Sequence, residues 1–276
     1  MKFQTNLHKN DDKSFLLEVE IPKKEVKSKY EEIVAKQAQK ANVKGFRKGK
    51  APVKVVEEKI GQDKLKNILV EEIIKEVYPK AIKNLDLNPI IHPQIDIKST
   101  ELENDWEINF TSAELPEVEV NTLYDKVKEA NTKSKIWKPG EEIKEEDKGN
   151  QNKDKQIQKI IDVIIKNTKI NLPKVLIDQE ISRKLTQLID QVNQAGMQLE
   201  QYLSSKGITI EELKEQYRNE IINSWKIDLV LEKISDEKNI EISEEDTKKI
   251  DDSKMNPYIA AKILRRQKTL EYLLTL

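Results

Sequence analysis

The chain has 276 residues, with 49 Lys or Arg against 50 Asp or Glu, so its net charge at neutral pH is −1. This balance excludes a protein that binds polyanions over its whole surface, although a local basic face remains open. The absence of cysteine excludes disulfides and thiolate chemistry, and with only His8 and His92 as histidines we expect no metal site and no cofactor.

The first 114 residues alternate between strand and helix patterns. Alternation of apolar and polar side chains predicts strands at residues 2–8, 14–21, 94–99 and 105–114. Apolar stripes at helical spacing predict helices at residues 22–41, 53–60 and 63–85. Pro79 interrupts the last of these stripes and predicts a kink or a restart of the helix. This order of elements indicates an α+β domain over residues 1–114, in which helices pack on one face of an antiparallel sheet.

The composition changes after residue 114. Residues 115–150 contain a short extended run, charged residues and the breakers Pro139 and Gly140, which predicts an extended linker with few core residues. From residue 151 onwards, apolar side chains recur at helical spacing, so residues 151–276 are expected to form an all-α domain. In that domain Thr209 and Glu212 form a capping box at the start of the longest helix.

The most informative stretch is residues 45–52, Gly-Phe-Arg-Lys-Gly-Lys-Ala-Pro, between the first two predicted helices. Its glycines permit backbone conformations closed to other residues, and Pro52 favours the start of a helix. The side chains expected to face outward are those of Phe46, Arg47, Lys48 and Lys50. The stretch does not fit a phosphate-binding loop, because only three residues separate the glycines, Ala51 replaces the hydroxyl residue, and a helix precedes it.

The segment around this stretch is strongly basic. Residues 22–54 contain eleven Lys or Arg against three Glu, a net charge of +8. Such a segment suits a polyanionic partner, although a solvated helix face explains it equally well. For Phe46 the competing interpretation is a small satellite of the core.

Residues 45–52 resemble the ribosome-docking signature of the bacterial trigger factor family. Residues 115–120, 172–181 and 202–209 resemble other parts of the same family, so the resemblance covers most of the chain. It implies an ATP-independent, cytoplasmic bacterial chaperone that docks beside the peptide exit tunnel, against a ribosomal protein and rRNA, and holds nascent polypeptides with its C-terminal helices. The docking residues that it implies are Gly45, Phe46, Arg47, Lys48, Gly49, Lys50 and Pro52. Further contacts with rRNA are expected from Lys23, Lys24, Lys27 and Lys44.

Client binding is expected at apolar positions left open on the C-terminal helices. The candidates are Met197, Leu199, Tyr202, Leu203, Tyr217 and Trp225, for each of which packing between helices is the competing interpretation.

Trigger factors normally insert a prolyl-isomerase domain of the FK506-binding type in the region of residues 115–150. A domain needs at least about 50 residues, so this linker is too short and we expect no isomerase activity. Whether the free protein forms a homodimer is left open.

Two other functions compete with the chaperone hypothesis. One is a prolyl isomerase with a degenerate site, which an isomerisation assay on a proline peptide would reveal. The other is a soluble holdase or helical adaptor that does not bind ribosomes, which cosedimentation would distinguish.

The sequence has no secretory signal and no run of about 18 apolar residues, so we expect a soluble intracellular protein without membrane contact.

Overall fold

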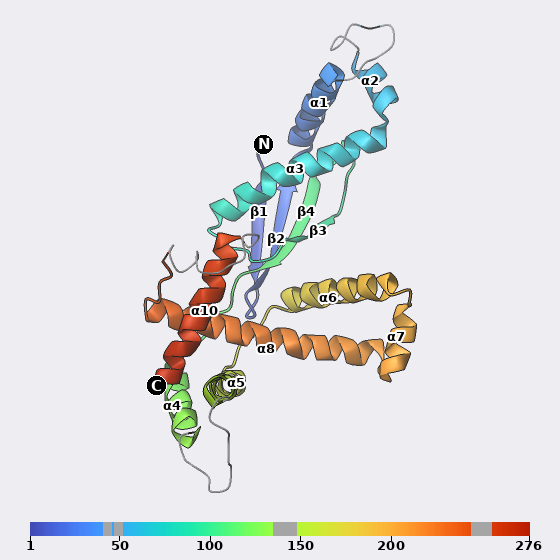
Figure 1. The fold of residues 1–276 in the computed structure, drawn as a ribbon. Coiled ribbons are helices and arrows are strands. Elements are labelled where there is room, and N and C mark those ends of the chain that lie inside the picture. The colour runs from blue at the N-terminus through green and yellow to red at the C-terminus, as the bar shows by residue number, and fades with distance from the viewer. Residues whose placement is uncertain (41–45, 47–51, 135–147, 244–255) are drawn as a thin grey trace. The chain divides into compact units, whose positions relative to one another are not determined.

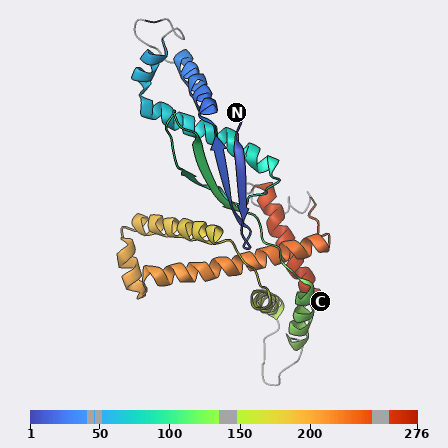
Figure 2. The same ribbon diagram turned by 180° about the vertical axis from the view of Figure 1, so that it is seen from behind.

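The computed structural model describes residues 1–40, 46, 52–134, 148–243 and 256–276. The chain divides into two compact units (Figures 1 and 2). The first unit comprises Met1–Leu115 with Pro173–Leu176, and the second comprises Pro116–Leu172 with Ile177–Leu276. Each unit has its own architecture.

The first unit contains an antiparallel sheet and three helices, as the sequence predicts. Its elements are β1 (Gln4–Lys9), β2 (Ser14–Ile21), α1 (Lys23–Lys40), α2 (Val53–Ile60), α3 (Gln62–Asn84), β3 (Gln94–Ile97) and β4 (Trp106–Ala113). The strand order is β1-β2-β4-β3, so the first and last hairpins of the unit meet at the pairing of β2 with β4. Helix α3 lies across one face of this sheet (Figures 1 and 2).

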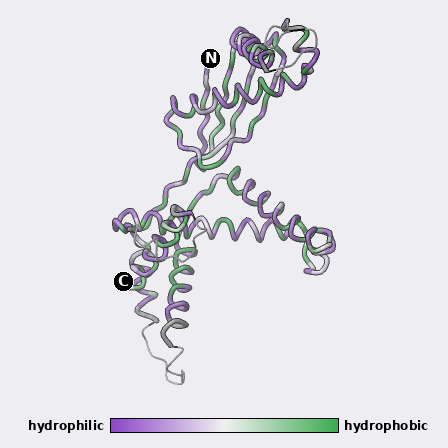
Figure 3. The backbone as a smooth tube through the Cα atoms, turned by 45° about the horizontal axis from the view of Figure 1, so that its top comes forward, coloured by the Kyte–Doolittle hydropathy of each residue, from purple (hydrophilic) through white to green (hydrophobic). Residues whose placement is uncertain are grey.

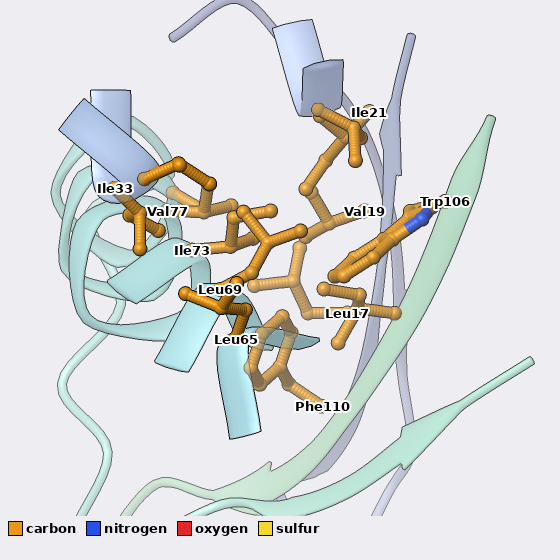
Figure 4. Packing of buried hydrophobic residues seen from close by; sticks show 14 of the residues in the cluster. Leu17, Val19, Ile21, Ile33, Leu65, Leu69, Ile73, Val77, Trp106 and Phe110 are labelled. Atoms are coloured by element: carbon orange, nitrogen blue, oxygen red, sulfur yellow. The ribbon is translucent and has the colours of Figure 1, made fainter. Parts of the chain in front are cut away.

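The core of the first unit lies between that face and the helices. Pairing in register places Leu17 opposite Phe110 and Val19 opposite Ile108, so their side chains share one face of the sheet. They meet Leu65 and other apolar side chains of the helices, and all of these are fully buried (Figure 4). Each large apolar side chain buried in this way contributes about 1.5–3 kcal/mol to folding. The alternation of apolar and polar residues along the strands therefore gives the sheet one apolar face, and the helices pack on that face.

Pro79 lies inside a continuous α3, so the helix does not restart there as one of the two expected outcomes had it. The helix runs from Gln62 to Asn84 with Pro79 inside it. Pro79 is exposed, whereas Val77 and Ala81 are fully buried against the core. A proline removes one backbone hydrogen bond, and on the solvent side water can satisfy the carbonyl that is freed. Packing of the buried face keeps the helix continuous.

The second unit is helical, as predicted for the C-terminal part of the chain. Its elements are α4 (Asn121–Ser134), α5 (Lys148–Asn167), α6 (Lys174–Gln194), α7 (Leu199–Lys206), α8 (Ile210–Glu237) and α10 (Pro257–Thr275). Helices α4, α5, α10 and the C-terminal half of α8 enclose a buried apolar cluster. Helices α6 and α8 run in opposite directions and are joined through α7 (Figures 1 and 2). We call residues 177–225 of this hairpin the arm.

Part of the predicted linker is a helix of the second unit. The sequence predicts extended structure and few core residues over 115–150, but residues 121–134 form α4. Val120, Leu123 and Val127 are buried in the core of the second unit. Their spacing of three and four residues is helical, and the charged residues between them are explained by the exposed face of α4.

Candidate functional site

The residues of the docking signature connect α1 with α2. We call residues 45–52 the docking segment. The structure describes Phe46 and Pro52, and both are exposed, with 42% of Phe46 accessible. Phe46 does not belong to the buried cluster of the first unit, which argues against a satellite of the core. The other docking candidates, Gly45, Arg47, Lys48, Gly49 and Lys50, lie outside the described residues, as does Lys44.

The lysines of α1 are less available than the charge count suggests. Lys23 and Lys24 are exposed. Lys27 forms an ion pair of 2.7 Å with Glu103, and the hydrogen bond from this lysine lowers the pKa of the Glu103 carboxyl. Carboxylates from elsewhere in the chain therefore neutralise part of the +8 charge of residues 22–54. The sequence alone does not reveal this pair, because its partners are 76 residues apart.

A second carboxylate gathers three cations at the side of α1. Glu76 of α3 lies 2.9 Å from Lys80, 3.0 Å from Lys29 and 3.1 Å from the Met1 α-amino group. Hydrogen bonds from Lys80, then Lys29 and the α-amino group, lower the pKa of Glu76 to about 2. The carboxylate is thus ionised at neutral pH. Its ion pair with Lys29 connects α1 to α3.

A tyrosine and a glutamate join the two helices that flank the docking segment. The hydroxyl of Tyr30 in α1 donates a hydrogen bond of 2.9 Å to Oε1 of Glu57 in α2. Burial, and then Glu57, raises the pKa of Tyr30 to about 12, so the hydroxyl remains a donor at physiological pH. Gly61 directly connects α2 to α3 with a φ of 89°.

All six candidates for client contact lie on the arm, and none is buried. Met197 is 38% exposed. The half-buried candidates are Leu199, Tyr202, Leu203, Tyr217 and Trp225. Helix α7 at the end of the arm has no buried residue at all. Hydrophobic positions are interspersed with hydrophilic ones along the helices (Figure 3).

Charged side chains connect the two long helices of the arm. Lys184 of α6 forms an ion pair of 2.6 Å with Glu220 of α8. The same ammonium lies 5.0 Å from the centre of the Tyr217 ring, a cation–π contact. Tyr217 is therefore partly engaged within the arm.

Sequence reasoning missed an apolar groove between the end of α8 and the start of α10. The groove has a volume of about 580 Å³. Three of its lining side chains are strongly exposed: Tyr258 at 77%, Ile259 at 51% and Ile263 at 47%. The sequence places the two isoleucines on the buried stripe of the last helix, but that helix buries its C-terminal half instead, through Leu273 and its neighbours. The sequence signal that could have indicated the groove is the presence of three apolar residues, Tyr258, Ile259 and Ile263, in the first turns of this helix.

Neither a metal centre nor a membrane span is found in the described part of the chain. No group of three or more His, Asp or Glu side chains within it could hold a metal ion. Of the helices that are described, none combines the length and the apolar character that crossing a bilayer requires.

Comparisons with known proteins agree with these features. The family model described as "Bacterial trigger factor protein (TF)" matches residues 3–149, and the model of the C-terminus of the same family matches residues 132–258. The two matches overlap, so they leave no segment between them. A solved structure described as "Promiscuous Substrate Recognition in Folding and Assembly Activities of the Trigger Factor Chaperone" has the same fold, with a TM-score of 0.66, 14% identity and coverage of 99% of both chains.

Curated relatives match over shorter stretches. A trigger factor of Thermus thermophilus is 43% identical over 72 residues, which cover 26% of this chain and 18% of the relative. The trigger factor of Clostridioides difficile is 30% identical over 158 residues, 52% of this chain and 37% of the relative. The chain thus matches well under two thirds of the length of these relatives. Because one family model covers more than half of the chain, the protein belongs to the bacterial trigger factor family.

Proposed function

We propose that this protein is an ATP-independent chaperone of the bacterial cytoplasm that docks on the ribosome and holds nascent polypeptides as they leave the exit tunnel. The docking segment, residues 45–52, makes the ribosome contact, and the arm, residues 177–225, contacts the client. The observation that carries the proposal is that every apolar candidate on the arm is exposed or half-exposed in a chain of this family.

Docking relies on a small apolar contact surrounded by cations. Phe46 fills an apolar cleft of a ribosomal protein, while Arg47 pairs with carboxylate or phosphate through its planar guanidinium group. Lys23, Lys24 and Lys48 add attraction to rRNA that depends on salt. The exposure of Phe46 and the absence of an acidic partner for Lys24 among the described residues support these roles.

Client binding relies on many weak apolar contacts. Apolar side chains such as Tyr202 and Leu203, a pair flanked by Gln201 and Ser204, let unrelated polypeptides bind and leave without a nucleotide cycle. Both side chains are half-buried on α7, a helix without any buried residue. When it is off the ribosome, the free protein is proposed to form a homodimer that shields such surfaces.

We also propose that the protein has no prolyl-isomerase activity. The matched N-terminal and C-terminal family models overlap over residues 132–149, which leaves no room between them for an inserted domain. Residues 121–134, which belong to the segment that the sequence predicts to be a linker, form a helix that packs in the core of the second unit. Turnover of a proline-containing peptide at enzyme-like rates would refute this part of the proposal.

Two measurements test the chaperone function. The first is suppression of aggregation when a denatured model protein is diluted into buffer with the full chain. The double change Tyr202→Ser and Leu203→Ser should weaken suppression without loss of stability, because α7 has no buried residue. The second is cosedimentation with ribosomes, which the triple change Phe46→Ala, Arg47→Ala and Lys48→Ala should abolish. Full suppression by a wild-type chain that never cosediments would instead identify a ribosome-independent holdase.

A further inference from the structure

Helix α2 depends on its neighbours for its position. It has eight residues, and helices of this length are not stable by themselves in water. Pro52 precedes it, and no side-chain hydrogen bond caps its N-terminus. Contacts with α1 and α3 therefore determine the direction in which α2 points.

Gly61 restrains one end of α2. Helix α2 ends at Ile60 and α3 begins at Gln62, so a single residue joins them. The backbone angles of Gly61, with φ 89° and ψ 135°, are closed to residues that carry a Cβ atom. This connection fixes the end of α2 near Ile60, which also packs against the core of the first unit. It does not fix the other end, where the docking segment begins.

The hydrogen bond between Tyr30 and Glu57 supplies the second restraint. The ring of Tyr30 packs against the core cluster, so the core holds its hydroxyl in place. Oε1 of Glu57 accepts from this hydroxyl at 2.9 Å, in a partly buried position. Because Glu57 lies in the middle of α2, the bond prevents the helix from swinging about Gly61.

We infer that Tyr30 and Glu57 are positioning residues that hold α2 against α1 and thereby present the docking segment to the ribosome. This inference rests on the proposed function of residues 45–52. Helix α1 ends at Lys40 and α2 begins at Val53, so the bond joins the two helices between which the docking segment lies in the chain. Binding is tighter when the helices that flank a binding segment are already held in place, because less conformational freedom is lost on binding.

A double-mutant cycle on ribosome affinity tests the inference. The full chain carries Tyr30→Phe, Glu57→Leu or both, and equilibrium binding of fluorescently labelled protein to purified ribosomes gives the Kd. We expect each single change to raise the Kd by about three- to tenfold, the size of effect that a typical intramolecular hydrogen bond has. The double change should raise it no further than a single one, since the two act through one bond. Glu57→Gln retains an acceptor and should bind within about twofold of wild type.

The second unit offers a matched control. There the hydroxyl of Tyr124 donates to Oε2 of Glu237 at 3.0 Å, so Tyr124→Phe removes a bond of the same kind. It should leave the Kd for ribosomes unchanged, and circular dichroism should show every variant folded.

The possible outcomes separate the inference from the proposed function. If Tyr30→Phe binds like wild type while the triple change at Phe46, Arg47 and Lys48 abolishes binding, the positioning role is wrong and docking stands. The same conclusion follows if Tyr30→Phe and Tyr124→Phe weaken binding equally. If the wild-type chain does not bind ribosomes, both the docking function and the inference fail.

Discussion

The side chain of Asn131 in α4 donates a hydrogen bond of 2.9 Å from Nδ2 to the backbone carbonyl of Leu273 in α10. The bond is buried, and its partners lie 142 residues apart in the chain. Leu273 is in the last turn of α10, where carbonyl groups lack partners within the helix. Asn131→Leu leaves this carbonyl buried without a donor, so we expect the free energy of unfolding to fall by about 1–3 kcal/mol. Urea denaturation followed by circular dichroism measures the loss.

The neighbouring residue provides the control for Asn131. Thr132 is exposed, and its hydroxyl donates only to the carbonyl of Lys128 within the same helix, at 2.8 Å. Thr132→Ala should therefore change the free energy of unfolding by less than about 0.5 kcal/mol. Equal losses for the two variants would mean that the bond to Leu273 contributes nothing beyond the helix propensity of α4.

Glu76 should make the stability of the first unit depend on pH. Its pKa is lowered to about 2 by Lys80, Lys29 and the Met1 α-amino group, so the folded state binds its proton less readily than the unfolded state. The stabilisation is present above the unfolded pKa of about 4.3 and is lost as the pH falls towards 2. Because the carboxylate is partly solvated, Glu76→Gln should destabilise by about 1 kcal/mol at pH 7.

The destabilisation by Glu76→Gln should shrink as the pH falls from 7 to 3, which denaturation curves at several pH values would show. Glu71 is the control on the same helix, since it forms an exposed pair of 3.3 Å with Lys75. Glu71→Gln should have little effect at any pH in this range. A destabilisation by Glu76→Gln that is constant with pH would show that the ion pairs do not contribute.

Gly61 and Gly207 should respond differently to substitution. Both have positive φ, but Gly207 lies in the left-handed helical region, with φ 66° and ψ 30°, whereas Gly61 has ψ 135°. Asparagine tolerates the left-handed helical conformation of Gly207 but not the conformation of Gly61. We expect Gly61→Asn to destabilise by about 1–3 kcal/mol and Gly207→Asn by less than about 1 kcal/mol.

Chemical denaturation of the two glycine variants measures this difference. A Cβ atom at either position would meet no atom within 4 Å, so steric clash does not complicate the comparison. If the two variants lose the same stability, backbone strain at Gly61 is not the deciding factor.

Local patterns in the sequence account for most of the elements. The alternation of Phe15, Leu17 and Val19 predicts β2 because it depends only on which face is buried. The capping box is likewise local: the backbone N–H of Glu212 donates to the Thr209 hydroxyl at 3.2 Å, and that of Thr209 donates to the Glu212 carboxylate at 2.8 Å. Such signals need no knowledge of the rest of the chain.

The features that the sequence did not predict depend on distant contacts. Helix α4 was not predicted because its core residues Leu123 and Val127 pack in a cluster with α5, α8 and α10, which follow later in the chain. The pairing of Lys27 with Glu103 joins residues 76 positions apart, so a count of charges could not separate free lysines from paired ones. The restart of the helix that is expected at Pro79 does not occur for the same reason, because the effect of the proline depends on which side of α3 faces solvent.

The groove between α8 and α10 should bind a hydrophobic dye. Tyr258 and Ile263 line it and are 77% and 47% exposed, so an anilinonaphthalene sulfonate should gain fluorescence on binding there. Tyr258→Ser with Ile263→Ser should lower this fluorescence by about half or more, since the three most exposed large apolar side chains among the described residues line the groove. Ile189→Ser is the matched control, because Ile189 is 38% exposed on the arm and does not line the groove. Equal decreases for the two variants would show that the dye binds exposed apolar side chains without preference for the groove.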